Sequence, residues 1–212
     1  YVVTSIDACG VESLPRGEVS ISSNILSVTY GVHLTWNAVT GADYDRVYKD
    51  PTNGSGVYGW IGDNITRTQV DYNTSPVTSD APPAERLPFT GADNKPATVG
   101  YYQQRIIYAN TNNEPLTVFT SQTADYDSLR ASSPARDDEA ITFTIKGQQV
   151  NEIRHVVSLN ALLLLTSGAV WQITEGETGV LTPSNHGARI QSYYGSSWVR
   201  PAVVGDTILY VQ

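Results

Sequence analysis

Hydrophobic and polar residues alternate over many short stretches of this chain. The alternation is clear in Tyr1–Asp7, around Leu34 and Trp36, and around Ile141 and Ile145, where each pair shares one face of an expected strand. No stretch keeps the 3.6-residue period of an amphipathic helix. The pattern therefore predicts an all-β protein.

The first 80 residues predict a β-sandwich. They contain about seven short alternating segments separated by turn residues at intervals of roughly 8–12 positions. Glu18–Ser23 is expected to be the second of these strands. A later strand should carry Tyr44, Arg46 and Tyr48 on one face.

A linker is expected after the sandwich. Residues 74–98 are rich in Pro, Ser, Asp and Gly, and proline cannot donate to a strand ladder. The boundary is placed near Pro82 and Pro83, so that the linker covers 81–98 and a second domain covers 99–212.

The second domain predicts part of a β-propeller-like fold. The same pattern recurs near residues 101, 159 and 204: small or β-branched residues, then a polar turn, then an apolar strand. The recurrence gives a period of about 45–58 residues. The last copy, ending in Ile208–Gln212, has no stop signal after it, and Tyr1–Asp7 has none before it. The expectation is that the chain is a piece of a larger protein and that both ends fall inside strands.

Composition removes several functional classes. The formal net charge is −8 and no basic stripe exists, which argues against direct nucleic-acid binding. Cys9 is the single cysteine, so neither an intrachain disulfide nor a cysteine-based metal site can form. The longest apolar run, Ala161–Leu165, is too short to cross a bilayer.

The acidic residues offer weak candidates for chemistry. Asp137–Glu139 could hold calcium, but the spacing of a calcium loop is absent and a solvated turn is the better interpretation. Asp125 and Asp127 flank Tyr126 and could imitate a glycosidase pair, but they lie among Ser, Thr and Ala, where turn formation is their natural role. The histidines, which are expected at surface or hydrogen-bonded positions, are far apart in sequence: His33, His155 and His186. No catalytic set, metal site or cofactor is predicted.

Aromatic residues give the one candidate contact site. Tyr101, Tyr102, Tyr193, Tyr194 and Trp198 lie next to glycine and glutamine and could form a sugar site or a seam between subunits. Tyr193, Tyr194 and Trp198 are the proposed contact residues of this group.

The first region resembles a fibronectin type III domain. The stretch LTWNAVTGADYDRVYKD is similar to the second and third strands of that family, with Trp36 as the core tryptophan. The hairpin that ends such domains is missing after Tyr72 and is matched instead by YVVTSIDACGVESLP at the start. This order suggests a circular permutation, in which Tyr1–Asp7 pairs with the strand that contains Tyr44 and Tyr48. The alternative is that residues 1–15 belong to a preceding domain.

The second region resembles the tail nozzle, or tail tubular protein B-like, family of short-tailed phages. The resemblance rests on long collinear stretches, among them TVGYYQQRIIYANTNNEPLTVFTSQ, RHVVSLNALLLLTSGAVWQI and SYYGSSWVRPAVVGDTILYVQ. It covers roughly residues 85–212. The family implies a propeller body, a ring of identical subunits expected to be a hexamer, and no catalytic residues.

The resemblance makes a structural virion protein of the phage tail the leading expectation. Its partners would be other tail proteins and copies of itself, with DNA passing through the channel without sequence-specific binding. A carbohydrate-binding or host-adhesion module is the alternative. A polysaccharide hydrolase using Asp125, Asp127 or Glu139 is a third and weaker one.

Overall fold

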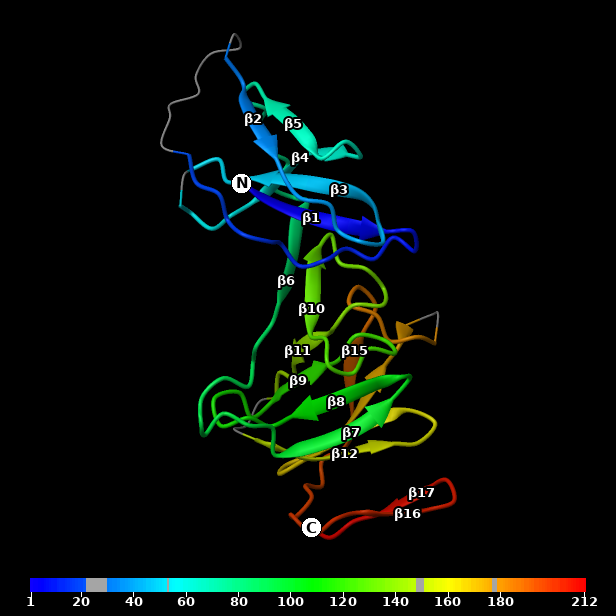
Figure 1. Cartoon of the computed structure of the whole chain (residues 1–212). Coiled ribbons are helices and arrows are strands. Elements are labelled where there is room, and N and C mark those ends of the chain that lie inside the picture. The colour runs from blue at the N-terminus through cyan, green and yellow to red at the C-terminus, as the bar shows by residue number, and fades with distance from the viewer. Residues whose placement is uncertain (22–29, 53, 148–150, 177–178) are drawn as a thin grey trace. The chain divides into compact units, whose positions relative to one another are not determined.

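The computed structural model describes residues 1–21, 30–52, 54–147, 151–176 and 179–212. Across these residues the chain is built of β-strands without an α-helix, which confirms the predicted all-β class (Figure 1). It forms two compact units. The first contains residues 1–84 together with 132–134, and the second contains 85–131 and 135–212.

The first unit has a three-stranded sheet and a two-stranded sheet. In the larger sheet β3 (Ala42–Lys49) lies between β1 (Val2–Asp7) and β4 (Gly59–Asn64), and all neighbours are antiparallel. The smaller sheet pairs β2 (Val32–Thr35) with β5 (Thr68–Asp71). The predicted pairing of the first strand with the strand that holds Tyr44 and Tyr48 is confirmed, since Val2 lies opposite Tyr48 and Ile6 opposite Tyr44.

The two sheets of the first unit share a small core. Leu34 from β2, Val47 from β3 and Ile61 from β4 are buried together, and Trp36 packs against them from the same side as Leu34. Alternation along β3 sends Arg46 to the opposite face. This face carries the ionic network described below.

A second chain segment runs antiparallel to β1 on its outer side. The amide of Arg16 donates to Val3 O over 3.1 Å, and the amide of Val19 donates to Tyr1 O over 3.0 Å. Residues 18–21 form no regular strand, so the strand predicted over Glu18–Ser23 is wrong in its first four positions, and its last two lie outside the described residues. Isolated β-bridges, and not a continuous ladder, join this segment to β1.

The predicted linker contains a strand. β6 (Ala81–Glu85) pairs with β10 (Arg130–Ser133) in a two-stranded sheet, although β6 includes Pro82 and Pro83. A strand with a single partner leaves one backbone edge open, and proline is tolerated when its nitrogen points to such an edge. The prolines therefore restrict this segment without excluding it from a strand.

The second unit contains two four-stranded antiparallel meanders. The order of the first is β11-β9-β8-β7 and that of the second is β12-β13-β14-β15. The strand bounds are β7 (Thr98–Tyr102), β8 (Arg105–Ala109), β9 (Thr117–Thr120), β11 (Thr142–Thr144), β12 (Ile153–Ser158), β13 (Leu162–Thr166), β14 (Val170–Thr174) and β15 (Gly187–Ser192). A tight turn joins β7 to β8, whereas the long segment 121–141, which includes β10, separates β9 from β11.

The two meanders pack against each other over a common core. Its fully buried members include Ile107 on β8, Leu164 on β13 and Ile173 on β14, and the predicted inward positions Ile141 and Ile145 also belong to it. The approach of the two meanders is close at one glycine. A methyl group on Gly100 of β7 would lie 2.5 Å from Val156 Cγ1 of β12, so a larger residue at 100 requires β12 to move.

A third, shorter sheet completes the second unit. β16 (Ala202–Val204) and β17 (Thr207–Leu209) form a hairpin with Gly205 in the left-handed region at φ 59°. Ile208 and Tyr210 pack on Leu165 of the second meander. The apolar strand expected over Ile208–Gln212 therefore ends at Leu209.

Candidate functional site

The proposed contact residues lie on an exposed segment of the second unit. Tyr193, Tyr194 and Trp198 follow β15 and are 81 %, 65 % and 52 % exposed. We call these three residues the aromatic surface. The other two aromatics of the expected cluster do not join it as a group, because Tyr102 is buried in the core and Tyr101 packs on Tyr126. Tyr102 is therefore excluded from an exposed contact site.

Arg154 and His155, two side chains from β12, hold Trp198. The guanidinium carbon of Arg154 lies 5.5 Å from the centre of the indole, and the ring of His155 stands edge-on at 6.3 Å. Arg154 also donates to Ser196 O over 2.7 Å, and His155 Nε2 donates to Ser197 O over 2.9 Å. A cation over an indole orients the ring and contributes roughly 0.5–1 kcal/mol at an exposed site. The indole is therefore fixed while half of its surface stays open to solvent.

The backbone beneath the aromatic surface is tied down at several points. The amide of Ser196 donates to Thr166 O over 2.9 Å, and the amide of Ser197 donates to Val211 O over 2.7 Å. Gly195 makes this approach possible, since a methyl group there would lie 1.9 Å from Ser167 O. Two neighbouring exposed tyrosines thus stand on a fixed segment, which is the arrangement that a recognition surface needs.

A second exposed aromatic pair lies elsewhere in the second unit. The hydroxyls of Tyr101 and Tyr126 are 2.7 Å apart and their ring centres 5.7 Å apart, with the planes inclined by 64°. Asp125 and Asp127 flank Tyr126 and are exposed, as expected for a turn. Sequence spacing could not indicate this pair, because 25 positions separate its members.

Tyr102, the neighbour of Tyr101, is buried and has a structural role instead. Its hydroxyl donates to Glu175 Oε1, which also accepts a bond from Gln103 Nε2 over 3.2 Å. Burial, together with this carboxylate partner, raises the pKa of Tyr102 to about 12. Tyr102 therefore stays protonated at neutral pH and acts as a structural donor.

The acidic run at 137–139 is more ordered than a solvated turn. Glu139 is buried, and its Oε2 accepts a hydrogen bond from the amide of Arg136 over 3.1 Å. Asp138 Oδ2 accepts one from Gln122 Nε2 over 3.3 Å. The carboxylate of Glu139 is therefore engaged in local structure and is poorly placed to meet a calcium ion or a polysaccharide.

A buried arginine explains why this run is ordered. Arg105 is only 1 % exposed, and it donates to three backbone carbonyls: Ser121 O at 2.9 Å, Glu139 O at 2.6 Å and Asp137 O at 2.8 Å. Burial lowers the pKa of Arg105, while nearby Asp138 raises it. The alternation of β8 gave a usable signal, since the face that carries Ile107 into the core also carries Arg105.

The histidines have separate environments. His33 is exposed on β2, as predicted. His155 supports Trp198, whereas His186 Nδ1 contacts Thr182 O at 3.2 Å and its ring lies 5.1 Å from that of Phe143. Among the described residues, no three His, Cys, Asp or Glu side chains gather in a way that could hold a metal ion.

The first unit carries an ionic network centred on Arg46. Its guanidinium contacts the carboxylates of Asp80 at 2.5 Å, Asp63 at 3.1 Å and Glu12 at 3.5 Å. It also lies 5.7 Å from the ring centre of Trp60. Three carboxylates around one guanidinium give this outer face of the sheet a negative excess.

A separate buried ion pair joins the two sheets of the first unit. Asp71 of β5 has no exposed surface and accepts bonds from Lys49 Nζ at 2.8 Å, the Tyr1 hydroxyl at 2.6 Å and the amide of Thr74 at 2.6 Å. Burial by itself would raise the pKa of Asp71, but these donors outweigh it and the net pKa lies below the ordinary value.

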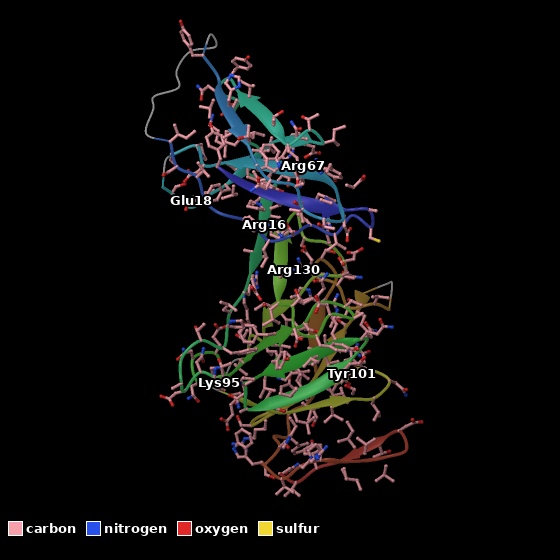
Figure 2. The ribbon with its side chains drawn as sticks, in the orientation of Figure 1. Arg16, Glu18, Arg67, Lys95, Tyr101 and Arg130 are labelled. Atoms are coloured by element: carbon pink, nitrogen blue, oxygen red, sulfur yellow. The ribbon has the colours of Figure 1, made fainter. Side chains whose placement is uncertain are left out.

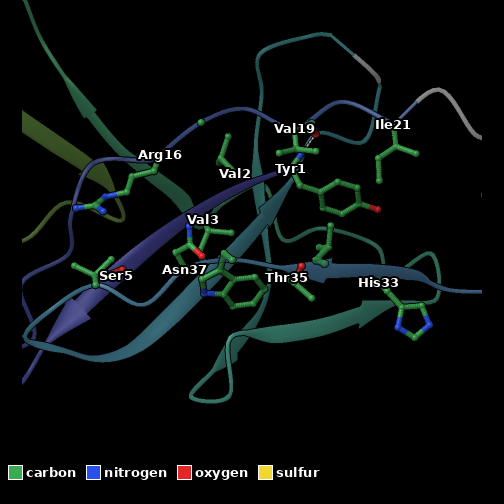
Figure 3. Close-up of a pocket in the computed structure, with 14 residues that line it drawn as sticks. Tyr1, Val2, Val3, Ser5, Arg16, Val19, Ile21, His33, Thr35 and Asn37 are labelled. Carbon is green, nitrogen blue, oxygen red and sulfur yellow. Dashed lines mark hydrogen bonds between the residues drawn. The ribbon is translucent and has the colours of Figure 1, made fainter.

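The first unit also has an open pocket of about 520 Å³ (Figure 3). It lies beside β1 and β2, and its wall includes Val3, Leu34 and Trp36. Arg16 and Asn37 are among its polar lining residues. The size falls in the range of small-molecule sites.

Comparisons with known proteins add no identification. No protein-family model matches the chain, and no curated protein matches it either. Within the residues that the structure describes, no helix has the length and apolar character needed to cross a membrane.

Proposed function

We propose that this chain is a structural component of a phage tail, part of the nozzle through which the genome leaves the particle. The observation that carries the proposal is the repetition in the second unit. Two four-stranded antiparallel meanders start at Thr98 and Ile153, and a hairpin of the same kind starts at Ala202. Consecutive four-stranded meanders that pack face to face are the building pattern of propeller blades. The spacing also matches the period of about 45–58 residues that the sequence indicates.

The first unit supports the proposal as a permuted fibronectin type III-like insertion. The strand order β1-β3-β4, the pair β2-β5 and the antiparallel segment outside β1 are consistent with such a sandwich whose last hairpin comes first in the chain. Trp36, which the resemblance makes the core tryptophan, is half-buried and packs against the buried cluster of Leu34, Val47 and Ile61.

The mechanism of such a protein is geometric. Identical subunits in a ring hold a tube open, and the net charge of −8 disfavours adhesion of DNA to the wall during ejection. No base-reading contact and no catalytic step is required. The location is the virion, at the distal end of the tail.

Electron microscopy tests the proposal. The protein is expected to assemble into closed rings with a central channel, and antibodies raised against it are expected to label the distal end of phage tails. Antibodies that label host cells but never particles, together with a protein that stays monomeric at high concentration, would show that the assignment is wrong.

A host-adhesion role is the second candidate, and the aromatic surface favours it. Trp198 presents a fixed, half-open indole, and Tyr194, four positions earlier in the chain, is 65 % exposed. Flat aromatic rings held on a rigid support stack on the apolar faces of sugars at little entropic cost.

Glycan-array binding tests this second role. Trp198→Ala and Tyr194→Ala are each expected to abolish binding to any glycan that the parent protein retains, whereas Tyr72→Ala, at an exposed tyrosine of the first unit, should leave it unchanged. Thermal melting shows whether the variants stay folded. Binding that survives in folded variants of both residues would contradict the role.

A further inference from the structure

The exposed pair Tyr101 and Tyr126 has the geometry of a covalent cross-linking site. Tyr101 stands on β7 (Figure 2), and its ring packs on Tyr126 at 5.7 Å with the two hydroxyls 2.7 Å apart. Both side chains are open to solvent, at 53 % and 41 % exposure. A small soluble oxidant can therefore reach either phenol.

The backbone holds the two tyrosines together. Tyr101 is opposite Ile106 in the β7–β8 ladder, and the amide of Ala124 donates to Gln104 O in the turn between these strands over 2.9 Å. The loop that carries Tyr126 is closed by the amide of Gln122, which donates to Ser128 O over 2.9 Å. The contact thus rests on fixed chain segments on both sides.

Local backbone strain indicates that the fold holds the β7–β8 turn and the loop at 122–128 in place. We call these two segments the strained corner. Gln103 and Gln104 adopt positive φ values of 44° and 59°, and Ala124 has φ 61°. Residues other than glycine rarely adopt this conformation, and they keep it only where surrounding contacts enforce it. The hydrogen bond from Ala124 to Gln104 joins two of these residues directly.

We propose that Tyr101 and Tyr126 form an intramolecular dityrosine bond when a peroxide and a one-electron peroxidase catalyst are present. Each phenol gives up one electron and one proton. The two radicals couple through ring carbons ortho to the hydroxyls. Each coupled carbon then releases its hydrogen as a proton to solvent, and the keto oxygen of the same ring takes up one proton from solvent, which restores the aromatic ring and its hydroxyl. One hydrogen peroxide takes up the two electrons and two protons and leaves as two waters.

The geometry favours this pair over the other exposed tyrosines. Among the described residues, Tyr101 and Tyr126 are the tyrosines whose rings contact each other, and their ortho carbons adjoin the two hydrogen-bonded hydroxyls. The hydrogen bond to Tyr126 raises the pKa of Tyr101, so this phenol carries its proton at neutral pH. The product would tie β7 to the loop at 122–128 and lock the strained corner.

Treatment with peroxidase and dilute hydrogen peroxide at neutral pH tests the proposal. The monomer band should gain blue dityrosine fluorescence, the intact mass should fall by two hydrogen atoms, and peptide mapping should join the peptides that contain residues 101 and 126. Tyr101→Phe and Tyr126→Phe should each remove this product, whereas Tyr193→Phe, at a tyrosine that is 81 % exposed, should keep it.

Two results would overturn the inference. One is a monomer that stays unmodified while cross-links form only between chains. The other is a monomer product that persists in folded Tyr101→Phe or Tyr126→Phe protein. Circular dichroism establishes the fold of each variant, and the phenylalanine rings preserve the packing.

Discussion

Arg105→Met is expected to destabilise the second unit by about 3–5 kcal/mol. The guanidinium satisfies the carbonyls of Ser121, Asp137 and Glu139 inside the protein. Methionine fills much of the aliphatic volume but offers no donor, so these acceptors stay buried without it. Replacing both the donor and its acceptors by apolar groups can leave the stability unchanged. Removing the donor alone leaves the buried acceptors unsatisfied, so the full cost of their desolvation remains.

Urea unfolding combined with hydrogen exchange measures this effect. The increase in exchange should concentrate in β8, β9 and the segment around Glu139. Arg189→Met, at an exposed arginine of β15, is the matched control and should change the free energy of unfolding by less than about 0.5 kcal/mol. Equal effects of the two variants would contradict the role assigned to Arg105.

Asp71→Asn is expected to cost the first unit about 3 kcal/mol at neutral pH. The substitution keeps the shape of the side chain but removes the charge that faces Lys49 Nζ at 2.8 Å. Lys49 is itself largely buried, with 13 % of its side chain exposed. A buried ammonium without its carboxylate partner is the main cost.

The same variant should flatten the acid limb of the stability curve. Because the pKa of Asp71 is lower in the folded than in the unfolded chain, its contribution is fully present above the unfolded value, about 3.9, and is lost as the pH falls through the folded value. The difference between parent and variant should therefore be largest near pH 7 and shrink below about pH 4.

Denaturation midpoints measured across this pH range check both the size of the stability difference between parent and Asp71→Asn and the sign of its change with pH. Asp43→Asn, at an exposed position of β3, should leave the curve unchanged. A gap between parent and Asp71→Asn that widens on acidification would show that the sign is wrong.

Local alternation determined the class of the fold and which residues of a strand share a face. The pairing of Tyr1–Asp7 with β3 was predicted from the resemblance to fibronectin type III domains, and the apolar positions of this strand face the same core as Val47. Leu34 and Trp36 share a side because they are two positions apart. Such features depend on a period of two along a strand, which is visible in sequence.

Side-chain placement beyond that period was decided by the tertiary structure. Tyr101 and Tyr102 are neighbours with similar chemistry, yet Tyr101 is exposed and Tyr102 packs in the core. The five aromatic residues expected at one contact site therefore do not all lie on the surface. A charged residue in an alternating strand is ordinarily assigned to solvent. Only the convergence of three carbonyls from distant segments makes the interior favourable for Arg105.

The sequence by itself thus determined that this protein is built from short β-strands and which residues of each strand share a face. The tertiary structure decided the partners: the proline-containing β6 beside β10, Asp71 beside Lys49, and Tyr126 beside Tyr101. The physical reason is the range of the interactions. Alternation is a property of neighbouring residues, whereas hydrogen-bond satisfaction of a buried charge and contact between loops depend on segments that only folding brings together.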